Sequence, residues 1–218
     1  MDLQISPYPG SFLLAKMNPS EKIITEKGVL ISCNGRYHQE NKIEARGVKN
    51  WLATAFGKSL IYNMYTAQES VQFIFAPKNN AELFSLDINA QCPVLFDPQS
   101  HFARTTGLDI ELAKQDWKSA LNDGLKLRTK GKGNLILKGH GTILEQTINT
   151  QKPIYIDESA LVAFEASLSL KTISKSIKET LTSGEGFLCQ VTGSGKIWLQ
   201  TRTAGESSGG SGVVSNLF

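Results

Sequence analysis

The segment SGEGFLCQVTGSGKIWLQTR, residues 183–202, predicts the fold class of this chain. Its apolar run IWL at 197–199 is followed by polar residues, and the related run LKLRTK at 125–130 largely alternates, so we expect strands with one face on a core and the other in water. Gly193 and Gly195 interrupt the pattern and predict a hairpin turn, because glycine readily adopts the positive φ angles that such turns need. The segment therefore indicates an all-β protein of short strands and turns.

Two further segments resemble this one and suggest an internal repeat. They are GKSLIYNMYTA from Gly57 and NDGLKLRTKGKGNLILKG from Asn122, the second with an expected hairpin at 130–133. The matched positions Ser59, Gly124 and Gly186 lie 65 and 62 residues apart (124 − 59 and 186 − 124). Each segment follows a stretch expected to be a short helix or wide loop, at 48–56, 114–121 and 173–181.

An alternating run followed by an apolar run opens each expected copy: KIITEKGVLIS from Lys22, LDINAQCPVLF from Leu86 and PIYIDESALVAF from Pro153. This alignment matches Leu30-Ile31 with Val94-Leu95 and with Leu161-Val162. Chance similarity is the alternative, because identities are few. We expect repeats at 1–80, 81–148 and 149–203, followed by a flexible Gly/Ser-rich tail at 204–218.

The composition limits the function classes. The 23 Lys and Arg exceed the 20 Asp and Glu by 3, far less than a dedicated binder of nucleic-acid backbones carries. The three cysteines, Cys33, Cys92 and Cys189, have no CxxC spacing, so we expect small buried side chains in a reducing compartment. The longest apolar run near the N-terminus is too short for a signal peptide, which favours a cytoplasmic protein.

The C-terminal third also resembles a known family. ALVAFEAS at 160–167, the segment 183–202 and, more weakly, PGSFLLAKMNPSEKIITEKGVLI at 9–31 are similar to the altered-inheritance-of-mitochondria family of bacterial and mitochondrial proteins. The resemblance implies short double-stranded β-helix or β-sandwich units, similar to the trp RNA-binding attenuation protein, repeated three times with pseudo-threefold symmetry and few short helices. It also implies trimers that form a ring of nine units, and it brings no catalytic residues.

Several fragments of catalytic or ligand motifs are better explained as structure. GESSG at 205–209 matches a nucleophile elbow but lies in the expected tail, and GSGK at 193–196 lacks the other residues of a phosphate loop. A cupin metal site needs clustered histidines, whereas His38, His101 and His140 are isolated. His140, between two glycines, is expected in a turn. The acidic pairs 109/111 and 157/158 are expected to be solubility charges.

One cluster carries a ligand hypothesis. Lys126, Arg128, Lys130 and Lys132 alternate along one expected strand and into its turn, so they could share a face. They could contact RNA phosphates or anionic lipid heads. A solvated edge protected from aggregation by lysines is the favoured alternative.

We therefore expect a non-enzymatic oligomeric scaffold or binding protein, with a trimer favoured and with no cofactor and no small-molecule substrate. An RNA-binding protein, by analogy to the attenuation protein, and a peripheral membrane-organising protein are the alternatives. A metal-dependent enzyme is a further, weaker possibility.

Overall fold

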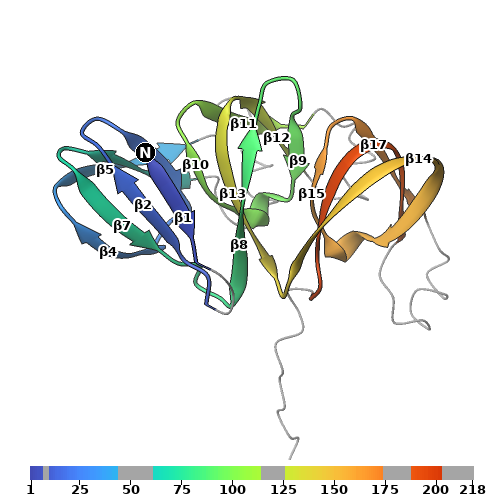
Figure 1. Cartoon of the computed structure of the whole chain (residues 1–218), viewed down its shortest axis with the longest axis horizontal. Coiled ribbons are helices and arrows are strands. Elements are labelled where there is room, and N and C mark those ends of the chain that lie inside the picture. Colours follow the sequence, from blue (N-terminus) through green and yellow to red (C-terminus); the bar gives the residue numbers. More distant parts are fainter. Residues whose placement is uncertain (7–9, 44–60, 114–125, 174–187, 203–218) are drawn as a thin grey trace, which may run out of the picture.

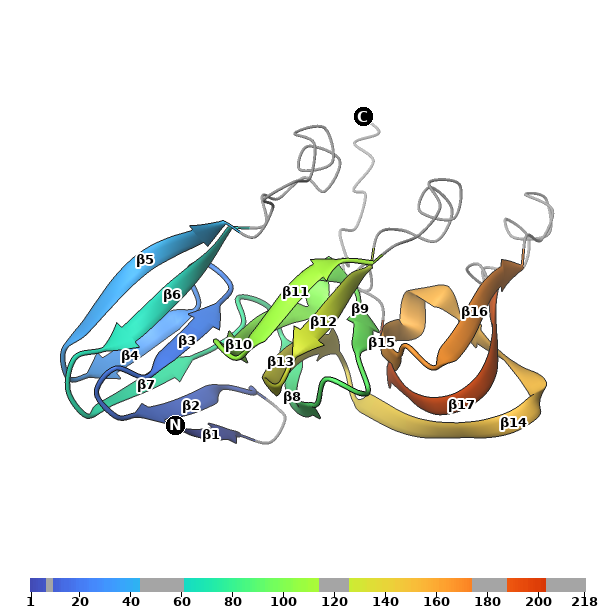
Figure 2. The ribbon, with the colours of Figure 1, turned by 90° about the horizontal axis from the view of Figure 1, so that it is seen from above.

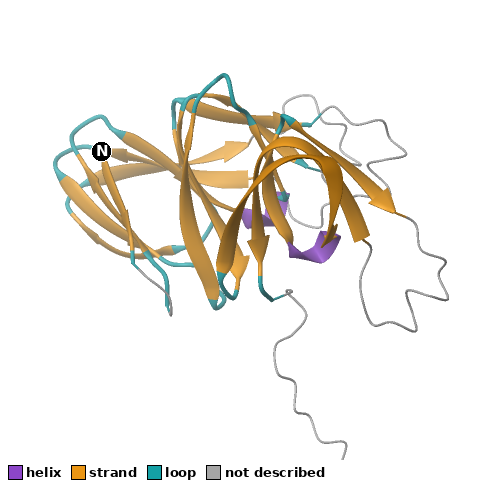
Figure 3. Cartoon of the chain, turned by 45° about the vertical axis from the view of Figure 1, so that its right-hand side comes forward, coloured by secondary structure: helices purple, strands orange, loops and turns teal. Residues whose placement is uncertain are grey.

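The computed structural model describes residues 1–6, 10–43, 61–113, 126–173 and 188–202. These residues form an all-β protein, as the alternating segments predicted, with two short 3-10 helices (Figures 1 and 3). The elements are β1 (Asp2–Ile5), β2 (Leu13–Met17), β3 (Lys22–Thr25), β4 (Leu30–Asn34), β5 (Tyr37–Ile43), β6 (Ile61–Ala67), β7 (Val71–Phe75), β8 (Ala81–Ile88), β9 (Val94–Phe96), η1 (Pro98–Ser100), β10 (His101–Thr105), β11 (Leu108–Leu112), β12 (Leu127–Gly131), β13 (Gly133–His140), β14 (Ile143–Asp157), η2 (Glu158–Ala160), β15 (Leu161–Glu165), β16 (Leu168–Ile173) and β17 (Leu188–Gln200).

The strands form three antiparallel sheets along the chain. Their orders are β1-β2-β7-β4, β5-β6-β3-β10-β13-β8 and β11-β12-β9-β15-β17-β14, with β16 also pairing with β17. In Figure 1 the strands β1–β7, β8–β13 and β14–β17 follow one another as an arc. Figure 2 shows that β5–β6, β11–β12 and β16 with the start of β17 all lie along the same side of this arc.

The expected hairpin at 130–133 is wrong. β12 ends at Gly131 and pairs with β11 and β9, whereas β13 begins at Gly133 and pairs with β10 and β8. The two strands therefore belong to different sheets and do not pair with each other. The φ angle of Gly131 is +96°, and a Cβ atom there would lie 2.7 Å from the carbonyl oxygen of Gly107. The glycines carry the chain around a corner between sheets.

The expected hairpin at 192–195 is also wrong. β17 runs without reversal from Leu188 to Gln200, and β14 pairs with it on both sides of the glycines. Gly193, with a φ angle of +108°, bends the strand, so its two halves pair with different strands on the other edge, β16 and β15. Residues 193–196 are therefore part of a paired strand and do not form a phosphate-binding loop.

The buried apolar residues form three clusters, one in each part of the arc, which we call the first, second and third cores. The first core combines Val29 and residues of β2, β3, β6 and β7 with residues of three later strands, Leu83 of β8, Phe102 and Ala103 of β10 and Ile136 of β13. The second core combines residues of β8, β9 and β11–β13 with Ile24 of β3 and Tyr62 of β6 and with residues of β15 and β17, Val162, Ala163 and Trp198. Each of these two cores thus includes residues from the next part of the chain, among them Phe102 in the first and Val162 in the second.

The expected limits of the repeats fit the strands only in part. The limit at 80/81 coincides with the start of β8, whereas the limit at 148/149 falls inside β14. The expected helical stretches, except Ile173 at the end of β16, and the expected tail from Ala204 onward lie outside the described residues.

Candidate functional site

The basic cluster predicted from the sequence is exposed only in part. Arg128 and Lys130 are exposed on the same side of β12, and Lys132 is exposed in the corner after it. Lys126, which precedes β12, is buried with 8% of its surface exposed. Lys126 is therefore not an exposed member of the cluster, although the N–H of Ala113 donates to its carbonyl oxygen and so continues the β11–β12 register.

Acidic side chains stand opposite the exposed basic residues. In the β11–β12 register, Glu111 is the partner of Arg128 and Asp109 is the partner of Lys130. Residues directly opposite in an antiparallel pair project from the same face. Asp109 also lies 3.9 Å from the ammonium group of Lys42 on β5. The stripe is thus a face of mixed charge, which weakens the case for phosphate binding.

The histidines occupy three different environments. His38 is exposed on β5, His140 is half-buried at the end of β13, and His101 is buried at the start of β10. The backbone of His140 accepts from the N–H of Arg202 and donates to the side chain of Gln200. The described residues contain no group of three or more His, Cys, Asp or Glu side chains that could hold a metal ion.

A polar cluster is buried where β3 and β6 meet β10. The Arg104 Nη1 atom lies 3.0 Å from His101 Nε2, and its guanidinium lies 5.1 Å from the ring centre of Tyr62. Because a guanidinium only donates, His101 Nε2 accepts and its proton sits on Nδ1. Burial, with the charges of Arg104 and Lys138, holds the pKa of His101 well below its usual value. This arrangement keeps a neutral imidazole in the interior.

The cysteines differ from the expectation in two of three cases. Cys189 is buried, as predicted, but Cys33 is half-buried on β4 and Cys92 is exposed before β9. Burial raises the pKa of the Cys33 thiol. None of the three takes part in a disulfide.

Two strand pairs join the parts of the arc, and they use the same register. At the first junction β3 pairs with β10, with Ala103 opposite Thr25 and Arg104 opposite Ile24. At the second junction β9 pairs with β15, with Ala163 opposite Phe96 and Phe164 opposite Leu95. Counted from Ala103 at the first junction and from Ala163 at the second, the residues are thus paired in the same way.

Hydrogen bonds at the two junctions also correspond. The N–H of Glu26, one residue after Thr25, donates to the carbonyl oxygen of Phe102 over 2.7 Å. The N–H of Asp97, one residue after Phe96, donates to the carbonyl oxygen of Val162 over 3.2 Å. The two hydrogen bonds occupy equivalent positions in their two antiparallel ladders. The two junctions are therefore built in the same way.

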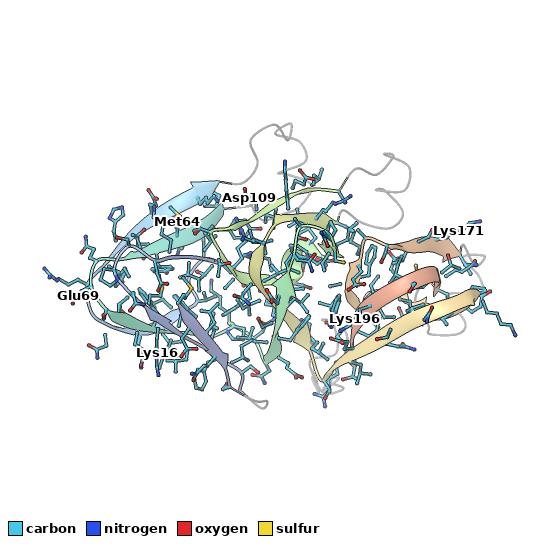
Figure 4. The ribbon with its side chains drawn as sticks, turned by 45° about the horizontal axis from the view of Figure 1, so that its top comes forward. Lys16, Met64, Glu69, Asp109, Lys171 and Lys196 are labelled. Carbon is cyan, nitrogen blue, oxygen red and sulfur yellow. The ribbon has the colours of Figure 1, made fainter. Side chains whose placement is uncertain are left out.

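The strands at the two ends of the arc have open edges. Among the described residues, β4 pairs only with β7, and β14 pairs only with β17. Ile31 on β4 is 66% exposed and Tyr155 on β14 is 57% exposed. Figure 4 places Glu69, which follows β6, and Lys171 on β16 at opposite ends of the molecule. Other strands, such as β1, β5 and β16, also lie at sheet edges, but β4 and β14 each carry an exposed large apolar side chain on theirs.

The fold and these edges can be compared with known proteins. The family model described as mitochondrial biogenesis AIM24 matches residues 3–202, which is most of the chain. This chain belongs to the AIM24 family. The resemblance predicted from the sequence is therefore confirmed, and it covers the described strands apart from Asp2 at the start of β1.

The AIM24 chain also has a structural counterpart. The crystal structure of a protein from Streptococcus pyogenes matches it with a TM-score of 0.73 and 15% sequence identity, covering 93% of this chain and 94% of that one. At this identity the likeness shows a common fold. A search of curated protein sequences found no match.

The sequence did not reveal the open edges of the AIM24 chain. The repeat alignment matched Val94-Leu95 of β9 with Leu30-Ile31 of β4. The strand that pairs in the same way as β4, through a register shift, is instead β10, which begins at His101. Its buried His101 and Arg104 break the apolar pattern, so β10 was missed in favour of the apolar β9. The constant spacing Thr25–Leu30, Phe96–His101 and Ile156–Leu161, five positions each, was a usable signal.

Regarding membranes, no helix in the described part of the AIM24 chain has the length and apolar character needed to cross a bilayer.

Proposed function

We propose that this AIM24-family protein is a non-enzymatic cytoplasmic scaffold whose copies assemble head to tail through their open strand edges. In this proposal the chain consists of three copies of one six-stranded unit. A trimer then forms a ring of nine units. The scaffold presents a repeated outer surface to its partners.

Strand pairing supports the threefold repeat. The proposed units are β2–β7, β8–β13 and β14–β17, where the long strands β14 and β17 each count as two. In every unit the third strand pairs with the last one through a register shift, after Leu30, His101 and Leu161 respectively. The second and third units also share a 3-10 helix capped by Asp97 or Asp157, whose carboxylate accepts from the N–H two residues later.

One observation carries the assembly proposal. The chain uses one kind of strand pairing twice to join its parts, and within its described residues the two edges that would continue the series have no strand beside them. An exposed edge with large apolar side chains is a hazard for aggregation unless another chain covers it. Ile31 and Tyr155 lie on these edges. Pairing with a second copy would cover both.

The alternative of an RNA-binding or membrane-binding protein has less support. Lys130 and Arg128 face Asp109 and Glu111, and the equivalent positions of the other sheets do not repeat the basic side chains. Gln190 and Met64 occupy the places that correspond to Arg128. A ring would therefore carry this mixed-charge stripe once per chain.

Size-exclusion chromatography with light scattering tests the proposal. We expect a mass above that of the 23.9 kDa chain at micromolar concentration, with a trimer as the closed form. The variant Ser85→Asp, which adds a charge at an exposed position of β8 in the middle part of the arc, should keep that mass. A strict monomer for the unaltered chain would refute the scaffold.

A further inference from the structure

We infer that the open edge of β4 in one copy pairs antiparallel with residues 154–156 of β14 in the next copy. The register would place Ser32 opposite Ile156, Cys33 opposite Tyr155 and Asn34 opposite Ile154. This inference rests on the proposed assembly and specifies its interface, residue by residue.

The register follows from the two junctions inside the chain. β4, β10 and β15 are equivalent because each pairs with the last strand of its unit through the same register shift, which aligns Ser32 with Ala103 and Ala163. Thr25 and Phe96 are the residues opposite these alanines. Ile156 corresponds to Phe96, because each directly precedes an aspartate that caps a 3-10 helix. Ser32 is therefore expected opposite Ile156.

The third core supplies independent support. Phe102 completes the first core and is fully buried, and Val162 completes the second core with 2% exposure. The equivalent residue of β4 is Ile31, which is 66% exposed. Within the described residues, the third core receives no such residue from a following part of the chain. Ile31 of a second copy has the chemistry to fill this place.

The opposite edge makes the reciprocal contact. Ile24 of β3 is fully buried in the second core, and Leu95 of β9 packs against the third core. Each lies in the middle of the junction strand and reaches into the unit that follows. Tyr155 occupies this position in β14 and is 57% exposed. It would pack against the first core of the next copy.

The sizes of the paired side chains also agree. Ala103 and Ala163 are fully buried opposite the larger Thr25 and Phe96. The inferred interface places the small residue Ser32 opposite the larger Ile156. A small side chain at this position leaves room for the bulky residue on the partner strand, since interiors are packed to near crystal density.

The backbone groups fit the same ladder. By analogy with the Asp97-to-Val162 bond, the N–H of Asp157 would donate to the carbonyl oxygen of Ile31 in the next copy. By analogy with the 2.9 Å bond from Ala166 to Pro93, the N–H of Gly35 would donate to the carbonyl oxygen of Pro153. Because Pro153 has no backbone N–H, no acceptor is needed for it at this position.

The inferred contact joins two different edges, so it is heterologous. Such contacts form closed rings when the rotation between copies closes, and open filaments when it does not. The arc of the chain in Figure 1 bends in one direction, which favours closure.

Disulfide trapping tests the register with the full chain. In a Cys92→Ser background we replace Tyr155 with cysteine, so that it lies opposite the native Cys33, and oxidise with diamide. Opposed residues of an antiparallel pair have Cα separations of about 5.5 Å, within the range that disulfides span. We expect covalent dimers and trimers on non-reducing gels. Adding Cys33→Ser should abolish them, and Ser85→Cys in place of Tyr155→Cys should not produce them.

The outcomes separate the register from the assembly. Since Ile31 and Tyr155 are exposed in the single chain, Ile31→Asp and Tyr155→Asp should leave the circular dichroism unchanged and lower the mass to that of a monomer. A product that stops at covalent dimers, or that survives Cys33→Ser, contradicts the head-to-tail register. If both aspartate variants still assemble and no crosslink forms, the scaffold stands and this interface is wrong. If the unaltered chain is monomeric, both fail.

Discussion

At the scale of the residue, His101 should make stability depend on pH. Its pKa is lowered in the folded protein by burial and by the charges of Arg104 and Lys138. As pH falls below the ordinary value of about 6.5, the unfolded chain therefore binds a proton that the folded chain refuses. Between pH 6.5 and 5, the free energy of unfolding of the wild type should therefore fall by up to about 1.4 kcal/mol for each pH unit. The variant His101→Gln, which keeps an acceptor for Arg104, should not show this loss.

Urea unfolding at several pH values measures this difference. Above pH 7 the gap between wild type and His101→Gln should be constant, and below pH 6.5 it should shift in favour of the variant. His38→Gln, at an exposed position of β5, is the matched control and should follow the wild type. Parallel pH profiles for wild type and His101→Gln would contradict a buried neutral imidazole.

The residue scale is also where sequence reasoning was weakest. Arg104 is only three positions from His101 on the same strand, but the sequence gave no indication that both would be buried, because Tyr62 of β6 reaches them only when β6 and β10 join one sheet. The exposure of Ile31 was equally hidden, since apolar runs predict burial whether or not a neighbouring strand exists. Cys189 was predicted correctly because its strand has apolar residues on both sides.

At the scale of the element, the corner between β12 and β13 should be sensitive to a single methyl group. Gly131 has a φ angle of +96°, and a Cβ there would meet the backbone oxygen of Gly107 at 2.7 Å. Backbone atoms cannot move aside as a side chain can. We expect Gly131→Ala to lower the free energy of unfolding by roughly 2–3 kcal/mol, since strained φ angles alone cost about 1–3 kcal/mol.

A second glycine separates the two causes of this loss. Gly10 has a φ angle of +83°, and a Cβ atom there would have no other atom within 4 Å, so Gly10→Ala adds strain without a clash. Its cost should be about 1–2 kcal/mol. Chemical unfolding of both variants measures the difference. Equal losses at Gly131 and Gly10 would show that the close approach to Gly107 contributes nothing.

Most strands could be predicted from the sequence, but the way they pair could not. The segments 125–130 and 197–202 correctly indicated the strands β12 and β17, and the glycines at 131 and 193 correctly marked changes of direction. The hairpins were wrong because positive φ angles serve a corner between sheets as well as a reversal within one. Only the partners of β12, β13 and β17 distinguish the two, and they lie far away in sequence.

At the scale of the whole molecule, assembly should raise the melting temperature as the protein concentration increases. The first and second cores are completed within the chain by Phe102 and Val162, whereas the third core would be completed by Ile31 of another copy. Binding that occurs only in the folded state raises stability with concentration. We therefore expect the melting temperature of the wild type, followed by tryptophan fluorescence, to rise by about 2–4 °C for each tenfold increase in protein concentration.

The same variants that test the interface test this coupling. Ile31→Asp and Tyr155→Asp each place a charge where the inferred contact is apolar, so their melting temperatures should be independent of concentration. Ser85→Asp introduces the same charge on β8, in the middle part of the arc, and should keep the slope of the wild type. If the wild type assembles in light scattering but melts at a constant temperature over the same concentrations, its copies do not complete each other's cores. The contact would then lie elsewhere on the folded surface.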